Sequence, residues 1–463
     1  MIGPPDASPA AAGVLTEPAP WPHRFRDRSA LHGIAVALLT VAGGSSIVKV
    51  ASMAKEVVIA GQFGAGDQID AFVIAFVLPS FVTGVVAAAF QSAVIPTYVQ
   101  VRDREGADIA RELVSTVTVW TCALLFALTA LLALAAPVLL PLVGSGFGPD
   151  KLWLTRRLFY LLLPLVVLTG LTSVWGAALN AEERFAVVAV APIATPLFVV
   201  ALVLGTARVI GVFAVPVGMV AGALVEGGLL AYAISRRRVW VAPRWTHAHP
   251  AVRVVLRQSI SMAAGSVLMG STVVVDNAMA AMLPAGSVAT LNYGNRFVLF
   301  LLAFCAGALS TAILPQFSAL VARCDWTGLR DVLRSCLRWI AVATVPLTAL
   351  LIAFSLPLTR LMFERGAFTP EATSLVARVQ VLYLIQVPFY MISIVLVRLI
   401  SAFKSNHLLA WGAAINLAVN VSLNWLFMRW IGVSGIALST TFVYIVSCGF
   451  LALMSWRLMK TCV

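Results

Sequence analysis

The chain has 463 residues, of which 61% are hydrophobic and only 11% are charged. Soluble domains average about 45–50% apolar and about 25% charged residues, so this composition excludes a water-soluble enzyme, a coiled coil and a disordered chain. The net charge of +13 suggests nucleic acid as a partner, but the cations gather mainly in predicted loops on one side of a membrane, which argues against it. We therefore expect an all-α polytopic membrane protein.

Residues 1–30 form a polar segment rich in proline and alanine, followed by a long apolar stretch. A cleaved signal peptide has a short apolar core and small residues at the cleavage site. This segment fits that pattern poorly. We interpret it as a disordered cytoplasmic tail that leads into a retained first helix.

Apolar segments follow one another in chain order, separated by Gly, Pro and charged residues. Their ranges are 31–60, 68–100, 112–143, 152–178, 185–207, 209–234, 254–282, 288–322, 334–358, 372–400, 407–428 and 433–456. A chain in lipid must satisfy its own backbone hydrogen bonds, and a transmembrane helix needs about 20 apolar residues. The segments therefore predict about 12 transmembrane helices.

The most basic loop, residues 236–253, connects the sixth and seventh predicted helices. Cytoplasmic loops of membrane proteins are enriched in Lys and Arg. The basic loops therefore place both termini in the cytoplasm.

The same loop divides an internal repeat. Residues 89–98 (AFQSAVIPTY) recur as 308–317 (ALSTAILPQF), so that Pro96 matches Pro315. The offset predicts an N-lobe at 31–235, with helices one to six, and a C-lobe at 254–463, with helices seven to twelve. Transporters with such parallel repeats bind substrate between the halves, which are related by a pseudo-two-fold axis along the membrane normal.

The first predicted helix carries Lys49, Lys55 and Glu56. A charge near the bilayer centre costs about 2.5–3.5 kcal/mol on insertion scales, so each is a functional candidate. Lys49 and Glu56 lie two helical turns apart on one stripe. The alternatives are a structural ion pair for Lys49, and extension of Lys55 and Glu56 to the outer membrane surface.

Two arginines complete the set of cations in predicted helices. Arg296 begins the eighth helix, and a guanidinium can hold phosphate through two hydrogen bonds. Its alternative partner is a lipid headgroup. Arg398 lies near a predicted cytoplasmic helix end, so we expect its side chain to extend to the membrane surface.

Three acids lie in or near the predicted spans. Asp70 stands at the external start of the second helix, where it could cap a helix. Glu226 lies in mid-helix and could accept a lysine of the first helix or bind a coupling cation or proton. Asp276 has the same options, with Arg296 as its candidate ion-pair partner.

The eleventh helix carries Asn416, Asn420 and Asn424 at intervals of four residues. Such a polar ladder suits hydrogen bonding between helices, or contacts with a sugar in a cavity. No G-x-x-x-x-G-K-[ST] sequence occurs, so we expect no ATP hydrolysis. The spacing of the six cysteines and the positions of the five histidines suggest no disulfide frame and no metal site.

Three groups of residues resemble the MurJ/MviN family of the MATE-like flippase superfamily. They are 63–72 (FGAGDQIDAF) with 75–79 (AFVLP), 291–296 (LNYGNR) and 361–369 (LMFERGAFT). The resemblance covers residues 40–456. It implies two six-helix lobes around a cationic cavity, and movement of an undecaprenyl-pyrophosphate-linked saccharide such as lipid II across the bacterial inner membrane.

By position, the resemblance implies that Lys49 and Lys55 stand where the family has two arginines, and that Arg296 is its helix-eight arginine. The family's acids fall on Glu56 and Asp70.

The chain departs from the family at three places. Residues 80–90 (SFVTGVVAAAF) lack the usual Arg-Arg pair and Glu, and Asn295 replaces an Asp. Many relatives also have two more C-terminal helices. These departures keep another lipid-linked glycan open as the cargo.

We therefore expect an alternating-access flippase rather than an enzyme, with no cofactor except a coupling cation or proton. The expected roles are pyrophosphate binding by Lys49, Lys55 and Arg296, sugar contacts by Asn416 and Asn420, gating by Glu56 and Asp70, and ion coupling by Glu226 or Asp276. Its partners would be the lipid-linked saccharide, membrane lipids and glycan-synthesis enzymes. The alternatives are an exopolysaccharide repeat-unit flippase, a cation-coupled multidrug exporter and a non-transporting scaffold.

Overall fold

The computed structural model describes residues 28–236 and 250–461. Every regular element in these two ranges is helical, as the composition predicts. Those of the first range are α1 (Arg28–Phe63), α2 (Asp67–Glu105), α3 (Ala107–Val143), α4 (Pro149–Leu162), α5 (Pro164–Ala181), α6 (Phe185–Val190), η2 (Ala191–Ile193), α7 (Ala194–Ile210), η3 (Gly211–Phe213) and α8 (Ala214–Arg236). Those of the second are α9 (Pro250–Ala280), α10 (Ser287–Ala322), α11 (Trp326–Ala353), α12 (Ser355–Phe363), α13 (Pro370–Leu384), α14 (Gln386–Ala402), α15 (His407–Ile431) and α16 (Val433–Thr461). Most of the predicted tail and of the basic loop lies outside the described residues.

Eight helical stretches of the described residues are long and apolar enough to cross a membrane. One of them, Phe185–Arg236, runs from α6 to α8, and its two long helices, α7 and α8, pack side by side. The chain turns between them at Gly211, whose φ is 59°. A multi-pass helical membrane protein is therefore confirmed, whereas the number of twelve spans stays a prediction.

The internal repeat extends to the helix boundaries. The pair α4 and α5 has 14 and 18 residues and begins at Pro149; the pair α13 and α14 has 15 and 17 residues and begins at Pro370. A later turn recurs as well: α7 ends at Ile210 and α15 at Ile431, and the glycine that follows each, Gly211 and Gly432, has a φ of 59° and 60°. That left-handed conformation favours glycine. The two halves of the chain therefore follow one structural plan.

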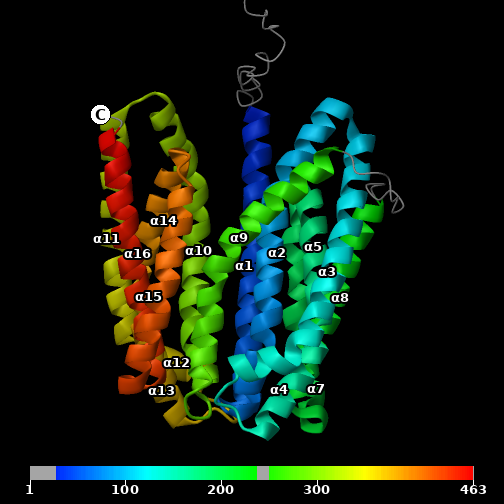
Figure 1. Cartoon of the computed structure of the whole chain (residues 1–463), viewed down its shortest axis with the longest axis vertical. Coiled ribbons are helices and arrows are strands. Elements are labelled where there is room, and N and C mark those ends of the chain that lie inside the picture. The colour runs from blue at the N-terminus through cyan, green and yellow to red at the C-terminus, as the bar shows by residue number, and fades with distance from the viewer. Residues whose placement is uncertain (1–27, 237–249, 462–463) are drawn as a thin grey trace, which may run out of the picture.

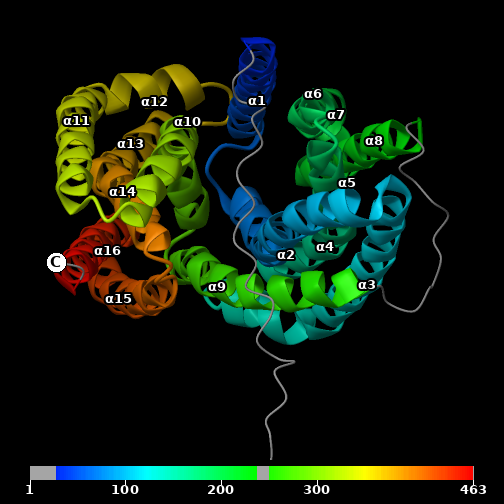
Figure 2. The same ribbon diagram turned by 90° about the horizontal axis from the view of Figure 1, so that it is seen from above.

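Two groups of helices, α2–α8 and α10–α16, stand side by side with α1 and α9 between them (Figures 1 and 2). α9 packs along α2 and α3 and also against α15 and α16, while α1 packs against α6 and α7. The groups meet at the end formed by loops 64–66, 144–148, 281–286 and 364–369, which we call the closed end. The ribbons diverge toward the opposite end, which we call the open end (Figure 1). The lobe boundaries drawn from the sequence stay a prediction.

Glycines let the closed end pack backbone against backbone. A Cβ atom on Gly286, whose φ is 84°, would lie 2.4 Å from the carbonyl oxygen of Ala65. On Gly366, with a φ of 60°, it would lie 2.1 Å from the carbonyl oxygen of Gly61. The amide of Ala367 donates a hydrogen bond to that same Gly61 carbonyl at 2.8 Å. Any larger residue at these two positions would have to displace the opposing backbone.

We predict that Gly222→Ala lowers the Tm of the detergent-solubilised protein. A Cβ atom on Gly222 of α8 would lie 2.4 Å from the Cα atom of Thr195 on α7, and overpacking costs about 1–3 kcal/mol. Gly205→Ala on α7 is the matched control, because no atom lies within 4 Å of its added carbon. Equal Tm values for the two variants would contradict the close α7–α8 contact.

Candidate functional site

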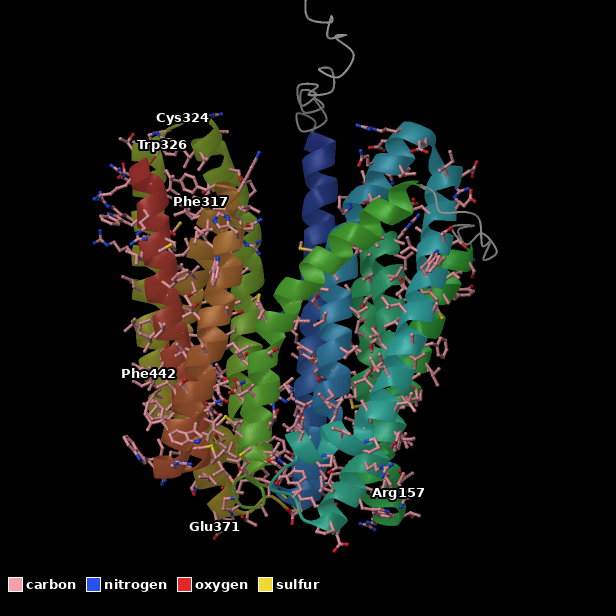
Figure 3. The ribbon with its side chains drawn as sticks, in the orientation of Figure 1. Arg157, Phe317, Cys324, Trp326, Glu371 and Phe442 are labelled. Carbon is pink, nitrogen blue, oxygen red and sulfur yellow. The ribbon has the colours of Figure 1, made fainter. Side chains whose placement is uncertain are left out.

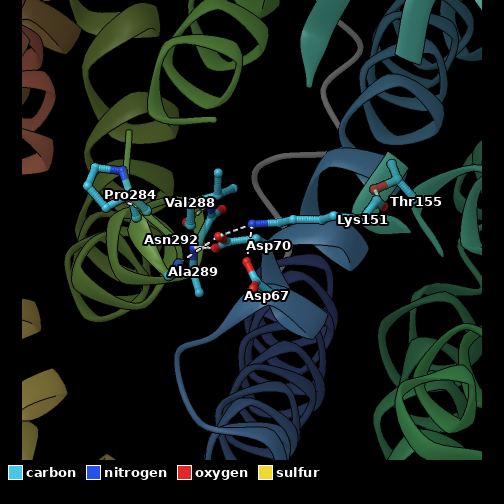
Figure 4. Close-up of polar contacts among 10 residues, drawn as sticks. Asp67, Asp70, Lys151, Thr155, Pro284, Val288, Ala289 and Asn292 are labelled. Atoms are coloured by element: carbon cyan, nitrogen blue, oxygen red, sulfur yellow. Dashed lines mark hydrogen bonds and ion pairs between the residues drawn. The ribbon is translucent and has the colours of Figure 1, made fainter. Parts of the chain in front are cut away.

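The two groups of helices are joined at the closed end by the carboxylate of Asp70, in the first turn of α2 (Figure 4). Its Oδ2 atom accepts a hydrogen bond from the amide of Gly286 at 2.7 Å, and its Oδ1 atom from the amide of Ala289 at 2.8 Å. Lys151 of α4 places its Nζ atom 2.8 Å from Oδ2. Asp70 is 1% exposed, so these donors replace the water that its charge would otherwise bind.

This carboxylate caps a helix other than its own. The N-cap residue of α10 is Gly286, which has no side chain to satisfy the first amides of that helix. Asp70 accepts from them instead, and the positive ends of two helix dipoles, those of α2 and α10, favour its negative charge. The predicted capping role is therefore seen, but it operates between the two halves of the chain.

Sequence reasoning missed Lys151. Its Nζ atom contacts Asp67 at 2.6 Å as well as Asp70, and it lies 4.0 Å from the ring centre of Phe147. The only sequence signal is a lysine in the first turn of a helix that begins at Pro149, where a cation is unfavourable without an acidic partner. Spacing along the chain did not indicate that the partner would be Asp70.

A second polar cluster lies between α1 and α10. The Oε1 atom of Glu56 lies 3.0 Å from Lys55 Nζ and 3.5 Å from Arg296 Nη2. Two turns away along both helices, Lys49 donates a hydrogen bond to the carbonyl of Ala303 at 3.0 Å. Lys49 and Glu56 therefore both face α10, consistent with their common stripe on α1.

This cluster holds three cations and one carboxylate. Arg296 is part-exposed, and its Nε atom is buried without a hydrogen-bond partner in the described parts of the chain, as is Oδ1 of the adjacent Asn295. The guanidinium therefore has donors that Glu56 does not use. An arginine with free N–H groups beside two lysines can bind an anion that carries several oxygen atoms.

A third cluster surrounds Asp276 of α9, which is 9% exposed. Its Oδ1 atom accepts from Asn420 Nδ2 at 2.9 Å and from Asn424 Nδ2 at 2.7 Å, both on α15. The hydroxyl of Thr440 on α16 lies 3.4 Å from Oδ2. The expected ion pair between Asp276 and Arg296 does not form, because Arg296 pairs with Glu56 on another helix.

The asparagine ladder thus connects helices of one half. Asn416 donates a hydrogen bond to Ser447 of α16 at 3.1 Å, while Asn420 and Asn424 bind Asp276. The structure therefore brings Asn416 and Asn420 to Asp276 and α16, and not to the cluster of Lys49 and Arg296. Their predicted contact with a sugar stays a prediction.

A cavity of about 450 Å³ lies beside this third cluster, among α9, α14, α15 and α16. Its polar lining comes from Thr272, Asp276, Tyr390, Ser393, Arg398, Asn416, Thr440, Tyr444 and Ser447. Arg398 therefore lines this cavity, whereas the sequence led us to expect its side chain to extend to the membrane surface.

Glu226 of α8 stands apart from all three clusters. It is part-buried, and it forms no ion pair within the described residues. The lysines proposed as its partners have other contacts, since Lys55 pairs with Glu56 and Lys49 binds the Ala303 carbonyl. The structure thus brings together Lys55, Glu56 and Arg296, and leaves Glu226 outside.

Comparison with known proteins gives related sequences along nearly the whole chain. The family model described as "Lipid II flippase MurJ" matches residues 59–461. A probable lipid II flippase MurJ of Synechocystis is 28% identical over 424 residues, which cover 88% of this chain and 78% of the relative. The lipid II flippase MurJ of Burkholderia cenocepacia is 28% identical over 429 residues, which cover 87% of this chain and 80% of the relative.

Solved structures share the fold. A lipid II flippase MurJ in an inward closed conformation has a TM-score of 0.76 at 22% identity, covering 89% of this chain and 87% of the other. A MATE family multidrug transporter in an inward-facing conformation has a TM-score of 0.73 at 12% identity, covering 90% and 95%. The predicted MATE-like fold is therefore confirmed.

We predict that Asp70→Asn loosens the closed end. An amide cannot accept from both α10 amides and Lys151 as a carboxylate does, and hydrogen bonds to a charged group contribute about 1.5–3 kcal/mol. Hydrogen exchange at the amides of Gly286 and Ala289 should therefore accelerate by about 10- to 100-fold. Asp67→Asn is the control, because Asp67 is 62% exposed and contacts only Lys151 among these groups. Equal exchange rates in the two variants would refute the capping role.

Proposed function

The chain belongs to the lipid II flippase MurJ family, and on this premise we propose that it moves lipid II across the bacterial inner membrane. The protein acts as a transporter, not an enzyme. Its cargo is a polyprenyl-pyrophosphate-linked saccharide, whose isoprenoid tail stays in the lipid while the headgroup crosses between the halves. Both termini, and with them the open end, face the cytoplasm.

The excess of cations between α1 and α10 is the observation that carries this proposal. Lys49, Lys55 and Arg296 share this cluster with one carboxylate, Glu56, so the cluster has a net positive charge. A pyrophosphate offers more oxygen atoms than Glu56 and a larger negative charge, and it competes for the N–H groups of Arg296. A multidrug exporter for organic cations would need the opposite charge balance here.

Gating follows from the contacts at the closed end. In the described state, Asp70 holds the start of α10, and the Gly286 and Gly366 contacts seal the loops. Release of the headgroup on this side requires Asp70 to exchange its donors for water. Pyrophosphate binding to Arg296 supports this step, because α10 carries both Arg296 and the amides that Asp70 caps.

The third cluster is suited to a coupling cation or proton. Asp276 and Thr440 offer carboxylate and hydroxyl oxygens, which hard cations prefer, while Asn420 and Asn424 turn their Nδ2 atoms toward Asp276. Oδ1 of Asn424 is buried without a hydrogen-bond partner among the described residues. A single carboxylate gives one negative charge, which favours a monovalent cation or a proton over a divalent ion. Binding here would supply energy that the chain cannot draw from a nucleotide.

We predict that Arg296→Ala and Lys49→Ala each reduce lipid II transport in reconstituted vesicles by tenfold or more. Each substitution removes charge-assisted hydrogen bonds to the pyrophosphate, which contribute about 1.5–3 kcal/mol apiece. Arg334→Ala is the matched control, since Arg334 is an exposed residue of α11. Wild-type transport rates in both cavity variants would contradict the binding site. An unchanged Tm would show that the loss is not due to unfolding.

We predict that Asp276→Asn abolishes the dependence of transport on a monovalent cation gradient or a pH gradient. The substitution removes the only charged oxygen donor of the cluster but preserves its size. Transport should be measured with each gradient imposed singly, beside Asp331→Asn, which alters an exposed acid of α11. A variant at Asp276 that still responds to the gradient would exclude this site from coupling.

A further inference from the structure

Helix α4 has two chemically different faces. The buried face carries Thr155, Leu158, Phe159 and Leu162. The exposed face carries Trp153, Arg156, Arg157 and Tyr160, at positions i, i+3, i+4 and i+7. These four side chains form one continuous stripe, in the order aromatic, arginine, arginine, aromatic. We call it the α4 stripe.

The length of α4 and α5 predicts that the stripe lies at the level of the lipid headgroups. α4 and α5 form one apolar stretch of 33 residues, Pro149–Ala181, which is about 50 Å long at 1.5 Å per residue, whereas the hydrocarbon core is about 30 Å thick. α4 is therefore the part that extends beyond the hydrocarbon at the closed end (Figure 1). Figure 3 shows Arg157 at the outer edge of that end.

Aromatic rings lie close to both guanidinium groups. The guanidinium carbon of Arg157 lies 4.6 Å from the ring centre of Trp153 and 5.1 Å from that of Phe213 in η3. The guanidinium carbon of Arg156 lies 5.8 Å from the ring centre of Tyr160. Stacking occupies the face of a guanidinium and leaves its N–H edge free. Neither arginine pairs with a carboxylate among the described residues, so both edges are available to an anion.

We propose that the α4 stripe binds the phosphate of an anionic phospholipid in the leaflet at the closed end. Trp153 is 59% exposed and Tyr160 39% exposed, which suits side chains that anchor a helix at the membrane surface. Two adjacent arginines with free N–H edges complement a phosphodiester oxygen pair and its net negative charge. The occupant is a membrane lipid rather than the transported pyrophosphate, because the stripe faces outward, away from α1 and α10.

A lipid bound to the α4 stripe would also stabilise the closed end. This part of the inference rests on the proposed function. Lys151, one to two turns from the arginines on the same helix, holds Asp70 at 2.8 Å. The hydroxyl of Thr155 donates to the carbonyl of Lys151 at 2.7 Å, which ties the first turn of α4 to the middle of the helix. A lipid that fixes α4 at the membrane surface therefore keeps Lys151 against Asp70.

The binding test uses the full chain in nanodiscs of phosphatidylcholine with and without phosphatidylglycerol. Native mass spectrometry counts the phosphatidylglycerol molecules that stay bound. The variant R156Q/R157Q should bind phosphatidylglycerol roughly 25-fold more weakly, since each basic residue near an anionic surface contributes about a fivefold step. The control R208Q/R360Q removes two exposed charges from the same end and should bind as the wild type does.

Three results would overturn lipid binding by the stripe. They are equal retention of phosphatidylglycerol by wild type and R156Q/R157Q, an equal loss in R208Q/R360Q, and a loss of lipid II binding in place of phosphatidylglycerol binding. The effect on the closed end has its own measurement, hydrogen exchange at Gly286 and Ala289. Phosphatidylglycerol should slow this exchange in the wild type and not in R156Q/R157Q. Neither measurement depends on transport, so a failure here is distinct from a failure of the flippase assignment.

Discussion

The closed end depends on the satisfaction of one buried negative charge. Asp70 is shielded from water, and three donors from two other helices take the place of water molecules at its carboxylate. A carboxylate in this position cannot lose its donors one at a time without a large cost, because an unpaired charge in an apolar surrounding is among the most unfavourable groups in a protein. The relative positions of α2, α4 and α10 are therefore linked, and we expect the closed end to open as a unit.

The two remaining polar clusters differ in what holds them together. Glu56 and Arg296 face each other across the space between α1 and α10, so their contact changes whenever those helices separate. Among the described residues, Asp276 binds side chains of α15 and α16, and its cluster can stay intact during such a movement. α9 takes part both in the cluster around Asp276 and in the packing between the halves, because it carries Asp276 and packs along α2 of the other half. A change of charge at Asp276 can thus act on the packing between the halves.

Sequence patterns predicted the helical membrane fold and its repeat, because the apolar segments and the repeated residues can both be recognised along the chain. The paired helix breaks near Leu163 and Ile385 follow the same repeat, but the sequence predicted unbroken segments at 152–178 and 372–400. Patterns along the chain also identified the charged residues, since any charge in an apolar helix stands out. The residue that each charged side chain contacts was harder to predict from the sequence, because this contact depends on how distant helices rotate and pack.

Two errors of pairing illustrate this. Asp276 binds amides where Arg296 was the expected partner, and Lys151 was overlooked although it neutralises Asp70. In each case the true partner lies on a helix whose rotation is fixed by tertiary packing, which a single helical stripe cannot report. Arg398 shows the same limit, since its position near a predicted helix end does not reveal that it lines a cavity among α9, α14, α15 and α16.

The glycines of the closed end also determine how this protein tolerates mutation. At Gly286 and Gly366 the opposing carbonyl oxygens lie so near that every possible replacement adds bulk, and none can improve the fit. No substitution at these two positions is neutral, so every substitution there weakens the backbone contact at the closed end. At a contact between side chains, a change in one residue can be compensated by a change in the other. The contacts of Gly286 and Gly366 are made with backbone atoms, so no such compensation is possible. Random mutagenesis should therefore show that a few positions of the closed end tolerate no substitution, whereas the positions around them tolerate many.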